Sequence, residues 1–173
     1  MILTVAGIQA ALGISWRNNK DIVNLYIKAS ANFTVKKPTE RSWCGDFAYW
    51  VLKESGVSPL PGFAKPAPGG GWDTVSRYGK LYPKFMAGED TPQTGDMYYM
   101  RYTTYAARAS GGNGTNHVGF VVEYNENEPT FRSIDGNTGT NPAILVKGVG
   151  GGYVNYNNNR AVELVDYFIR IPD

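Results

Sequence analysis

Helical and strand patterns occupy different parts of this chain, and their separation limits the folds open to it. Apolar residues recur at helical spacing mainly before about residue 55, whereas aromatic-rich or alternating segments follow one another from about residue 94. Helices followed by closely spaced strands predict an α+β domain, with N-terminal helices packed on a C-terminal antiparallel β-sheet. Because 173 residues, 42% of them hydrophobic, suffice for one sizeable core, we expect residues 1–173 to form a single domain.

Two helices are predicted before residue 32. The first lies within residues 1–14, begins near Thr4 and ends at Gly13. Its predicted apolar stripe consists of Ile8, Ala11 and Leu12. The second covers residues 19–31, with an acidic residue near its start and a basic residue near its end that complement the helix dipole. Its predicted apolar face consists of Ile22, Leu25, Tyr26 and Ala29.

A third helix is predicted over about residues 42–55, with the single cysteine of the chain, Cys44, near its start. Its apolar face consists of Phe47, Ala48, Val51 and Leu52, and Gly56 is a natural stop. Ser42 is a suitable N-cap, which would place Cys44 in the first turn, where unpaired backbone N–H groups and the helix dipole favour a thiolate. Cys44 is therefore a candidate nucleophile. The alternative is a small buried hydrophobe, because free cysteine is among the most buried residue types.

Proline and glycine separate this helix from the strands. Residues 58–71 hold four prolines and a run of three glycines, which predicts a long surface loop that either borders a binding cleft or is a plain linker. A short helix is predicted over residues 72–78. The predicted strands cover residues 96–102, 115–124, 131–137, 143–149 and 162–171.

The single histidine lies in the second of these strands. One face of this strand carries Val118, Phe120 and Val122, so His117 projects from the opposite face. Residues 125–129 have turn composition, so the next strand is expected to fold back antiparallel. If the hairpin is centred on Glu126, Asp135 stands opposite His117. If it is centred on Asn127, Asn137 stands opposite His117. Both registers place a polar partner on the face of the histidine, because side chains alternate with period two.

These residues predict a nucleophilic site. Cys44 would attack a carbonyl, His117 would act as base and then as acid, and Asp135 or Asn137 would hold the imidazole. The backbone N–H of Cys44 would stabilise the oxyanion. Candidates for a second oxyanion donor are Tyr26 and Gln93. The alternative is that residues 135–139 are only turn residues and that the histidine is a plain surface residue.

Four segments resemble the CHAP family, the cysteine, histidine-dependent amidohydrolases/peptidases of the NlpC-type, papain-like group. They are residues 43–51 (nucleophile helix), 95–99 (Gly-Asp strand), 116–121 (histidine strand) and 134–138 (acidic third member and following Asn). The resemblance covers about residues 40–140 and implies a papain-like α+β fold.

The resemblance also implies roles for single residues. Cys44 would be the nucleophile, His117 the base, Asp135 the third catalytic member and Asn137 an assisting polar residue. Glutamate is more usual where Asp135 stands, and aspartate is one methylene shorter, so Asn137 could take over the orienting role. Some family members bind calcium through an acidic loop before the cysteine. The corresponding residues 36–41 are basic here, so we expect no metal and no other cofactor.

The function implied by the resemblance is cleavage of an amide bond in peptidoglycan, by an N-acetylmuramoyl-L-alanine amidase or by a stem or cross-bridge endopeptidase. A phage lysin and an antibacterial effector both fit, and an effector would imply a cognate immunity protein as partner. We expect a monomer. Candidate substrate contacts are Trp43, Tyr102 and Tyr105, with residues 58–71 and 103–115 framing the groove.

Composition excludes other partners. The net charge of +2 with scattered basic residues gives no nucleic-acid face, and no apolar run approaches the length of a membrane span. Residues 1–14 lack the basic start and the cleavage site of a signal peptide, so we expect secretion or delivery to the target periplasm or cell wall without a Sec signal. Two alternatives stay open: a cysteine amidase or peptidase that acts on a small soluble amide, and a non-catalytic wall-binding module.

Overall fold

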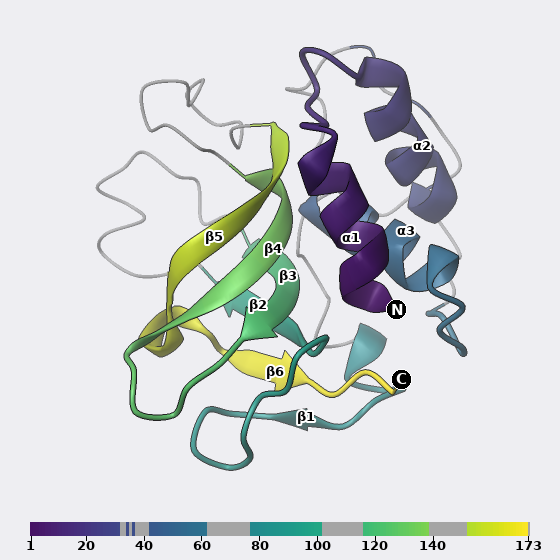
Figure 1. Cartoon of the computed structure of the whole chain (residues 1–173). Coiled ribbons are helices and arrows are strands. Elements are labelled where there is room, and N and C mark those ends of the chain that lie inside the picture. The colour runs from purple at the N-terminus through teal and green to yellow at the C-terminus, as the bar shows by residue number, and fades with distance from the viewer. Residues whose placement is uncertain are drawn as a thin grey trace.

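Three helices packed on one face of an antiparallel sheet make up the described part of the protein (Figure 1). The computed structural model describes residues 1–31, 34, 36, 42–61, 77–101, 116–138 and 152–172. Within these residues the predicted α+β architecture, with N-terminal helices on an antiparallel sheet, is confirmed. Every helix among them is too short or too polar to traverse a lipid bilayer.

Helix α1 (Ile2–Ala11) begins earlier and buries a different face than the sequence predicted. Met1 rather than Thr4 is its N-cap. All residues of the predicted stripe are exposed: Ile8, Ala11 and Leu12. The buried residues are Ile2 and Ala6. Because this helix is apolar on nearly every side, the spacing of its apolar residues does not select a face, and packing against α3 and the sheet does. Gly13, at φ +62°, ends this segment as predicted.

Helices α2 (Lys20–Ala31) and α3 (Cys44–Glu54) lie close to their predicted positions. In α2, Tyr26 is buried as expected, but Leu25 is 58% exposed. Helix α3 begins at Cys44 and buries its predicted apolar face. Its N-cap is Trp43, without a capping side-chain hydrogen bond, so the prediction of Ser42 as N-cap is wrong. Gly56, at φ +76°, follows its C-terminus.

The sheet has the strand order β1-β6-β2-β3-β4-β5. The strands are β1 (Lys84–Phe85), β2 (Met97–Arg101), β3 (Asn116–Glu123), β4 (Thr130–Thr138), β5 (Tyr153–Ala161) and β6 (Tyr167–Ile169). The predicted strands over 96–102, 115–124 and 131–137 correspond to β2, β3 and β4. Residues 162–171 instead begin with a short 3-10 helix, η3 (Val162–Leu164), before β6. Strands β1 and β5 were not predicted. The strand over 143–149, the helix over 72–76 and the loop over 62–71 lie outside the described residues.

The β3–β4 register decides between the two predicted hairpins. Phe120 pairs with Ile134 and Val121 with Ser133, which centres the hairpin on residue 127, and a β-bulge follows between Val121 and Glu123. Continued toward the start of β3, this register sets Gly119 opposite Asp135. The carboxylate thus lies diagonally from His117 rather than directly across from it.

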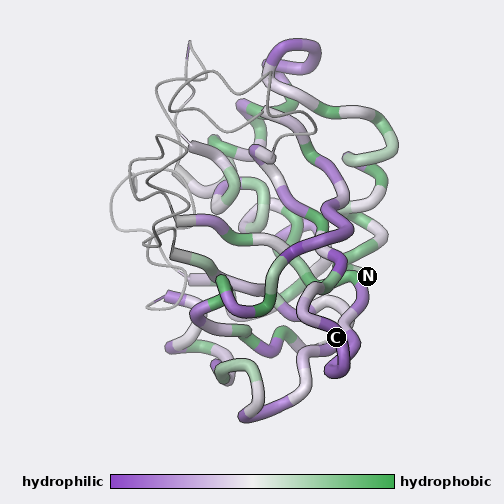
Figure 2. Tube along the Cα trace, turned by 90° about the vertical axis from the view of Figure 1, so that its left-hand side faces the viewer, coloured by the Kyte–Doolittle hydropathy of each residue, from purple (hydrophilic) through white to green (hydrophobic). Residues whose placement is uncertain are grey.

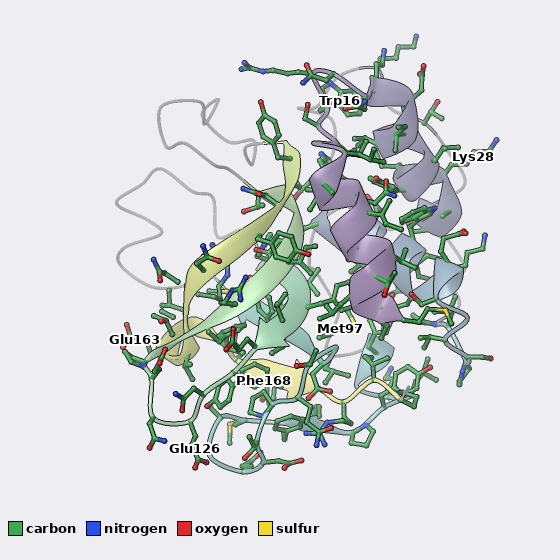
Figure 3. All side chains as sticks on the ribbon, in the orientation of Figure 1. Trp16, Lys28, Met97, Glu126, Glu163 and Phe168 are labelled. Carbon is green, nitrogen blue, oxygen red and sulfur yellow. The ribbon has the colours of Figure 1, made fainter. Side chains whose placement is uncertain are left out.

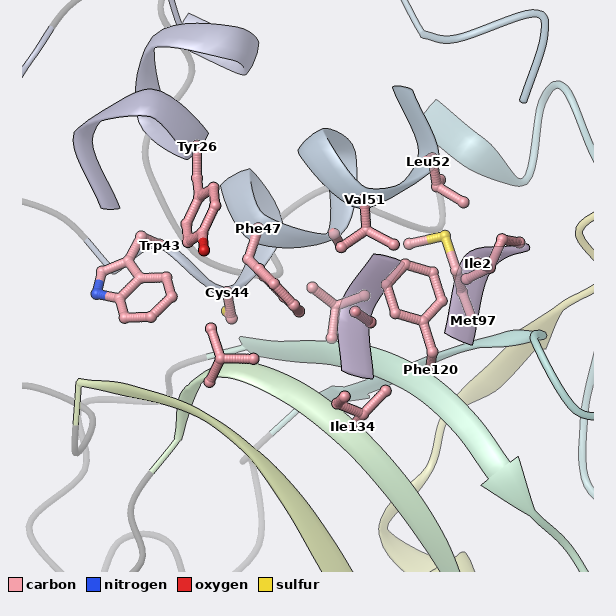
Figure 4. Close-up of a cluster of buried hydrophobic side chains, with 14 of the residues drawn as sticks. Ile2, Tyr26, Trp43, Cys44, Phe47, Val51, Leu52, Met97, Phe120 and Ile134 are labelled. Atoms are coloured by element: carbon pink, nitrogen blue, oxygen red, sulfur yellow. The ribbon is translucent and has the colours of Figure 1, made fainter. Parts of the chain in front are cut away.

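Buried side chains form two clusters, one on each face of the central strands. The cluster under the helices contains Met97, Val118, Phe120 and Ile134 from the sheet (Figure 4). The cluster on the other face consists of Phe85, Tyr98, Met100, Val121, Phe131 and Phe168. Apolar segments run through the helices and strands, whereas several connecting turns are polar (Figure 2). Charged side chains such as Lys28, Glu126 and Glu163 project outward (Figure 3).

Candidate active site

Cys44 lies in the first turn of α3 and is 1% exposed, at the end of the helix that faces the sheet (Figure 4). The helix is seated on β4 at Gly136, because a Cβ at this position would overlap the ring of Phe47. A glycine at residue 136 therefore allows the first turn of α3 to approach the strand that carries Asp135 and Asn137.

Asn137 contacts the segment that leads into Cys44. Its Nδ2 donates a hydrogen bond of 2.9 Å to Ser42 Oγ, which lies 3.9 Å from Cys44 Sγ. Asn137 adopts φ +58°, a left-handed conformation that asparagine tolerates better than most residues. Its Oδ1 is buried and has no hydrogen-bond partner among the described residues. The structure thus places the Asn137 amide on the cysteine side of the site.

His117, on β3, is 7% exposed, and its Nε2 lies 3.4 Å from Asp135 Oδ2. Asp135 is completely buried. The two residues share a face of the sheet, as the alternation of side chains predicted. His117 contacts Asp135, and Cys44 is linked through Ser42 to Asn137. Asp135 and Asn137 are two positions apart on β4.

Two further side chains hold the Asp135 carboxylate. Tyr98 Oη, from β2, donates a 2.5 Å hydrogen bond to Oδ1, and Arg160 Nη2, from β5, forms an ion pair with Oδ2. The Arg160 guanidinium carbon also lies 5.4 Å from the centroid of the Tyr98 ring. Sequence reasoning gave neither residue a catalytic role, and Arg160 could have been found only by recognising β5.

These contacts keep Asp135 ionised. Burial raises the pKa of Asp135, but the charge of Arg160 and hydrogen bonds from His117 and Tyr98 outweigh it and lower the pKa to about 2. Burial, followed by the negative charge of Asp135, raises the pKa of Tyr98 well above its usual value. Tyr98 therefore remains a protonated donor at neutral pH, and Asp135 remains a carboxylate.

Gly119 provides the space for this carboxylate. A Cβ at Gly119 would overlap Asp135 Oδ1 and would lie 2.9 Å from Tyr98 Cε1. The Asp135 side chain thus occupies the place that a side chain on β3 would fill. Sequence reasoning assigned no role to Gly119, because only the observed register places it opposite Asp135.

The remaining predicted residues that the structure describes take no part in the contacts given above. Trp43, a predicted substrate contact, is 0% exposed, and its ring centroid lies 6.0 Å from that of Tyr26. Tyr102 and Tyr105 lie outside the described residues. Tyr26 Oη donates to Gln9 Oε1 at 2.7 Å, within the core. Gln93 lies in the turn before β2, at the end of that strand away from Met100, the partner of His117.

The part of the chain that the structure describes contains no candidate metal site. Within those ranges, no group of three or more His, Cys, Asp or Glu side chains could hold an ion. Of the basic residues 36–41 before the cysteine, only Lys36 is described.

Comparisons with known proteins identify the family. The CHAP domain matches residues 35–137, more than half of the 173 residues. A search of curated proteins gives no match. Among solved structures, the chain is similar to the crystal structure of a wild type endolysin, LysIME-EF1, with 16% sequence identity and a TM-score of 0.44, covering 88% of this chain. It spans 63% of that endolysin chain, less than two thirds. With the CHAP domain matching over α3, β3 and β4 as far as Asn137, the chain belongs to the CHAP domain family.

Proposed function

We propose that this protein is a peptidoglycan hydrolase that cleaves an amide bond with Cys44 as nucleophile and His117 as acid and base. Membership of the CHAP family supports the reaction class. The observation that carries the proposal is that two sets of contacts end on β4, two residues apart: Cys44 is linked through Ser42 to Asn137, and His117 contacts Asp135.

In the proposed reaction, His117 takes the proton of the Cys44 thiol, and the resulting thiolate attacks the amide carbonyl carbon. The backbone N–H of Cys44 stabilises the oxyanion at the start of α3. His117 then protonates the leaving nitrogen, the C–N bond breaks and a thioester remains. Water attacks the thioester, His117 accepts its proton, and the acid product and the free thiol are released. Because Nε2 of His117 faces Asp135, Nδ1 is the nitrogen that exchanges protons in this scheme.

Asp135 and Asn137 have different roles in this proposal. Asp135 orients the imidazole, although it is shorter than the glutamate usual at this place. Asn137 acts on the cysteine side through Ser42. Because Ser42 Oγ accepts a hydrogen bond from Asn137 Nδ2, its own proton can point to Cys44 Sγ. A thiolate has no proton to give, so Ser42 is the donor whenever Cys44 is ionised.

The substrate bond within peptidoglycan is either the amide that joins the lactyl group of the sugar to the stem peptide, or a peptide bond of the stem or cross-bridge. The protein would work as a monomer, either as a phage lysin or as an antibacterial effector with a cognate immunity protein. It would act at the cell wall or in the periplasm of the target.

Purified cell walls test the proposal. Wild-type protein should lower their turbidity, and mass spectrometry of the soluble muropeptides should show which amide is cut. Cys44→Ala and His117→Ala should each reduce the rate by at least about three orders of magnitude while the far-UV circular dichroism stays unchanged. Intact walls with cleavage of small amides would instead favour a soluble substrate.

Alkylation separates the enzyme from a wall-binding module. Iodoacetamide should modify Cys44, the single thiol of the chain, rapidly below pH 7, and His117→Ala should slow this reaction. A thiol that stays inert at every accessible pH, in a protein that sediments with walls without cleaving them, would contradict the proposed chemistry.

A further inference from the structure

Arg160 lies behind the candidate histidine, on a strand that sequence reasoning missed. We infer that Arg160 is a positioning residue: by compensating the charge of Asp135, it sets the pH at which His117 gains and loses its proton. The inference rests on the proposed function, because that proton is the one the proposed reaction moves.

The geometry joins four residues from four adjacent strands, β2 to β5. Asp135 Oδ2 is shared between the Arg160 guanidinium and His117 Nε2, which lies at 3.4 Å, while Oδ1 accepts the hydrogen bond from Tyr98. The exposed fractions of these residues are 0% for Asp135, 9% for Arg160, 7% for His117 and 0% for Tyr98. Interactions between charges in such a place are screened far less than those on the surface.

One carboxylate oxygen therefore serves two cationic partners. A buried carboxylate alone beside an imidazole strongly favours the imidazolium, because the opposite charge is close and water is scarce. The permanent charge of Arg160 on the same oxygen offsets this effect. His117 then releases its proton at a lower pH than an uncompensated His–Asp pair would allow.

The other titratable groups around His117 within the described residues do not supply this compensation. Tyr98 stays neutral, since burial and the Asp135 charge raise the pKa of its hydroxyl. The first turn of α3 contains two buried titratable groups, Cys44 and Asp46, and both become negative on ionisation. Asp46 accepts a hydrogen bond from Ser30. Among the described residues, Arg160 is the cation that pairs with Asp135 besides the histidine itself.

The placement of Arg160 on β5 supports a specific role. This strand contains four asparagines, and Asn158 and Asn159 beside Arg160 are exposed. Arg160 is instead turned inward and lies with its guanidinium carbon 5.4 Å from the Tyr98 ring centroid. The ring packs against one side of the cation and so fixes its direction toward Oδ2.

The single histidine of the chain makes the test direct, because its NMR titration needs neither substrate nor activity. In Arg160→Met, the titration midpoint of His117 should rise by about one pH unit or more, since the carboxylate is no longer compensated. Arg160→Lys, which keeps the charge, should stay close to the wild type. The alkaline limb of the Cys44 alkylation profile should move in the same direction as the midpoint.

Loss of Arg160 leaves a buried carboxylate with one partner fewer, so Arg160→Met can fail to fold. Asp135→Asn and the double variant Asp135→Asn/Arg160→Met then carry the test. In Asp135→Asn, His117 faces an uncompensated guanidinium and its midpoint should fall. Removal of Arg160 from this background should raise the midpoint again.

The matched control is Arg132→Met. Arg132 lies on β4 and also pairs with a carboxylate, Glu123, at 3.0 Å, but both side chains are exposed, 49% and 66%. Its loss should leave the midpoint of His117 unchanged. Equal midpoints in folded wild type and Arg160→Met, or in the two Asp135→Asn backgrounds, would overturn the inference. Absence of wall hydrolysis by the wild type would contradict the proposed function and leave this titration result intact.

Discussion

At the scale of single residues, Asp135 and Asn137 show what a sequence pattern can and cannot resolve. Alternation along the strands correctly predicted that His117 has a polar partner on its own face. It could not choose the register, which depends on the turn and on the bulge after Val121. In the structure the carboxylate goes to His117 and the amide goes to Ser42, so two residues that competed for one predicted role contact different partners.

Ser42 gives the prediction at this scale. Ser42→Ala removes the hydroxyl that can donate to the Cys44 thiolate, a hydrogen bond to a charged group worth roughly 1.5–3 kcal/mol. The alkylation rate of Cys44 near pH 6 should therefore fall about tenfold or more. The measurement is the pH profile of iodoacetamide labelling by mass spectrometry.

The control for Ser42→Ala is Ser55→Ala, which removes a hydroxyl at the other end of α3. Its labelling profile should match that of the wild type. A Ser42→Ala profile that superimposes on both would show that the hydroxyl does not act on the sulfur.

At the scale of elements, the site depends on how closely α3 approaches β4. The contact is made at Gly136, whose missing side chain leaves room for Phe47. Helix α3 itself was predictable from the spacing of its apolar residues, but its distance from the sheet was not, because no local pattern encodes the meeting of two segments about ninety residues apart.

Gly136→Ala should therefore disturb the site as well as the fold. The added methyl overlaps Phe47, and overpacking of this kind costs about 1–3 kcal/mol. We expect a lower denaturant midpoint together with a loss of wall hydrolysis under conditions in which the variant is still folded, because Cys44 moves with its helix.

Gly56→Ala is the matched comparison for that variant. Gly56 has φ +76° and no atom near the position of a Cβ, so alanine strains the backbone without a clash, at the far end of α3. It should lose stability and keep activity. Equal activity per folded molecule in Gly136→Ala and Gly56→Ala would show that the α3–β4 approach does not matter for the reaction.

Strand β5 was missed for a physical reason. It reads YVNYNNNRA, and asparagine is depleted in strands because its side chain competes for backbone hydrogen bonds. Pairing with β4 overrides that preference. The strands with aromatic or β-branched runs, β2 to β4, were found at nearly their observed bounds.

At the scale of the whole molecule, two buried carboxylates respond to pH in opposite ways. Burial raises the pKa of Asp96 despite hydrogen bonds from Gln93 and Arg170, whereas Asp135 has its pKa lowered to about 2. A raised folded-state value stabilises the fold at low pH and loses that effect as pH rises. A lowered value stabilises the fold above the unfolded pKa and loses that effect as pH falls.

Asp135 should therefore contribute to acid unfolding in a defined window. Between its ordinary pKa of 3.8 and its folded-state pKa of about 2, the wild type should lose about 2 kcal/mol of unfolding free energy through this residue. Urea melts between pH 5 and pH 2 measure the loss, and the Asp135→Asn melts should show a shallower dependence on pH.

Asp96→Asn should change the pH dependence of stability in the opposite direction, because it removes a group that favours the fold at low pH. Its stability should fall more steeply than that of the wild type as the solution is acidified. Identical slopes for wild type and Asp135→Asn would mean that the carboxylate is not held in the arrangement seen here.

The empty position at Gly119 has a consequence for how this protein can change. Aspartate is the amino acid with the shortest side chain that carries a carboxylate. The acid beside His117 therefore cannot be exchanged for a shorter one to make room for a side chain at residue 119. Substitution of residue 119 is thus prevented by Asp135, which is close in space. The position that the Asp135 side chain constrains most is one that contributes no functional group.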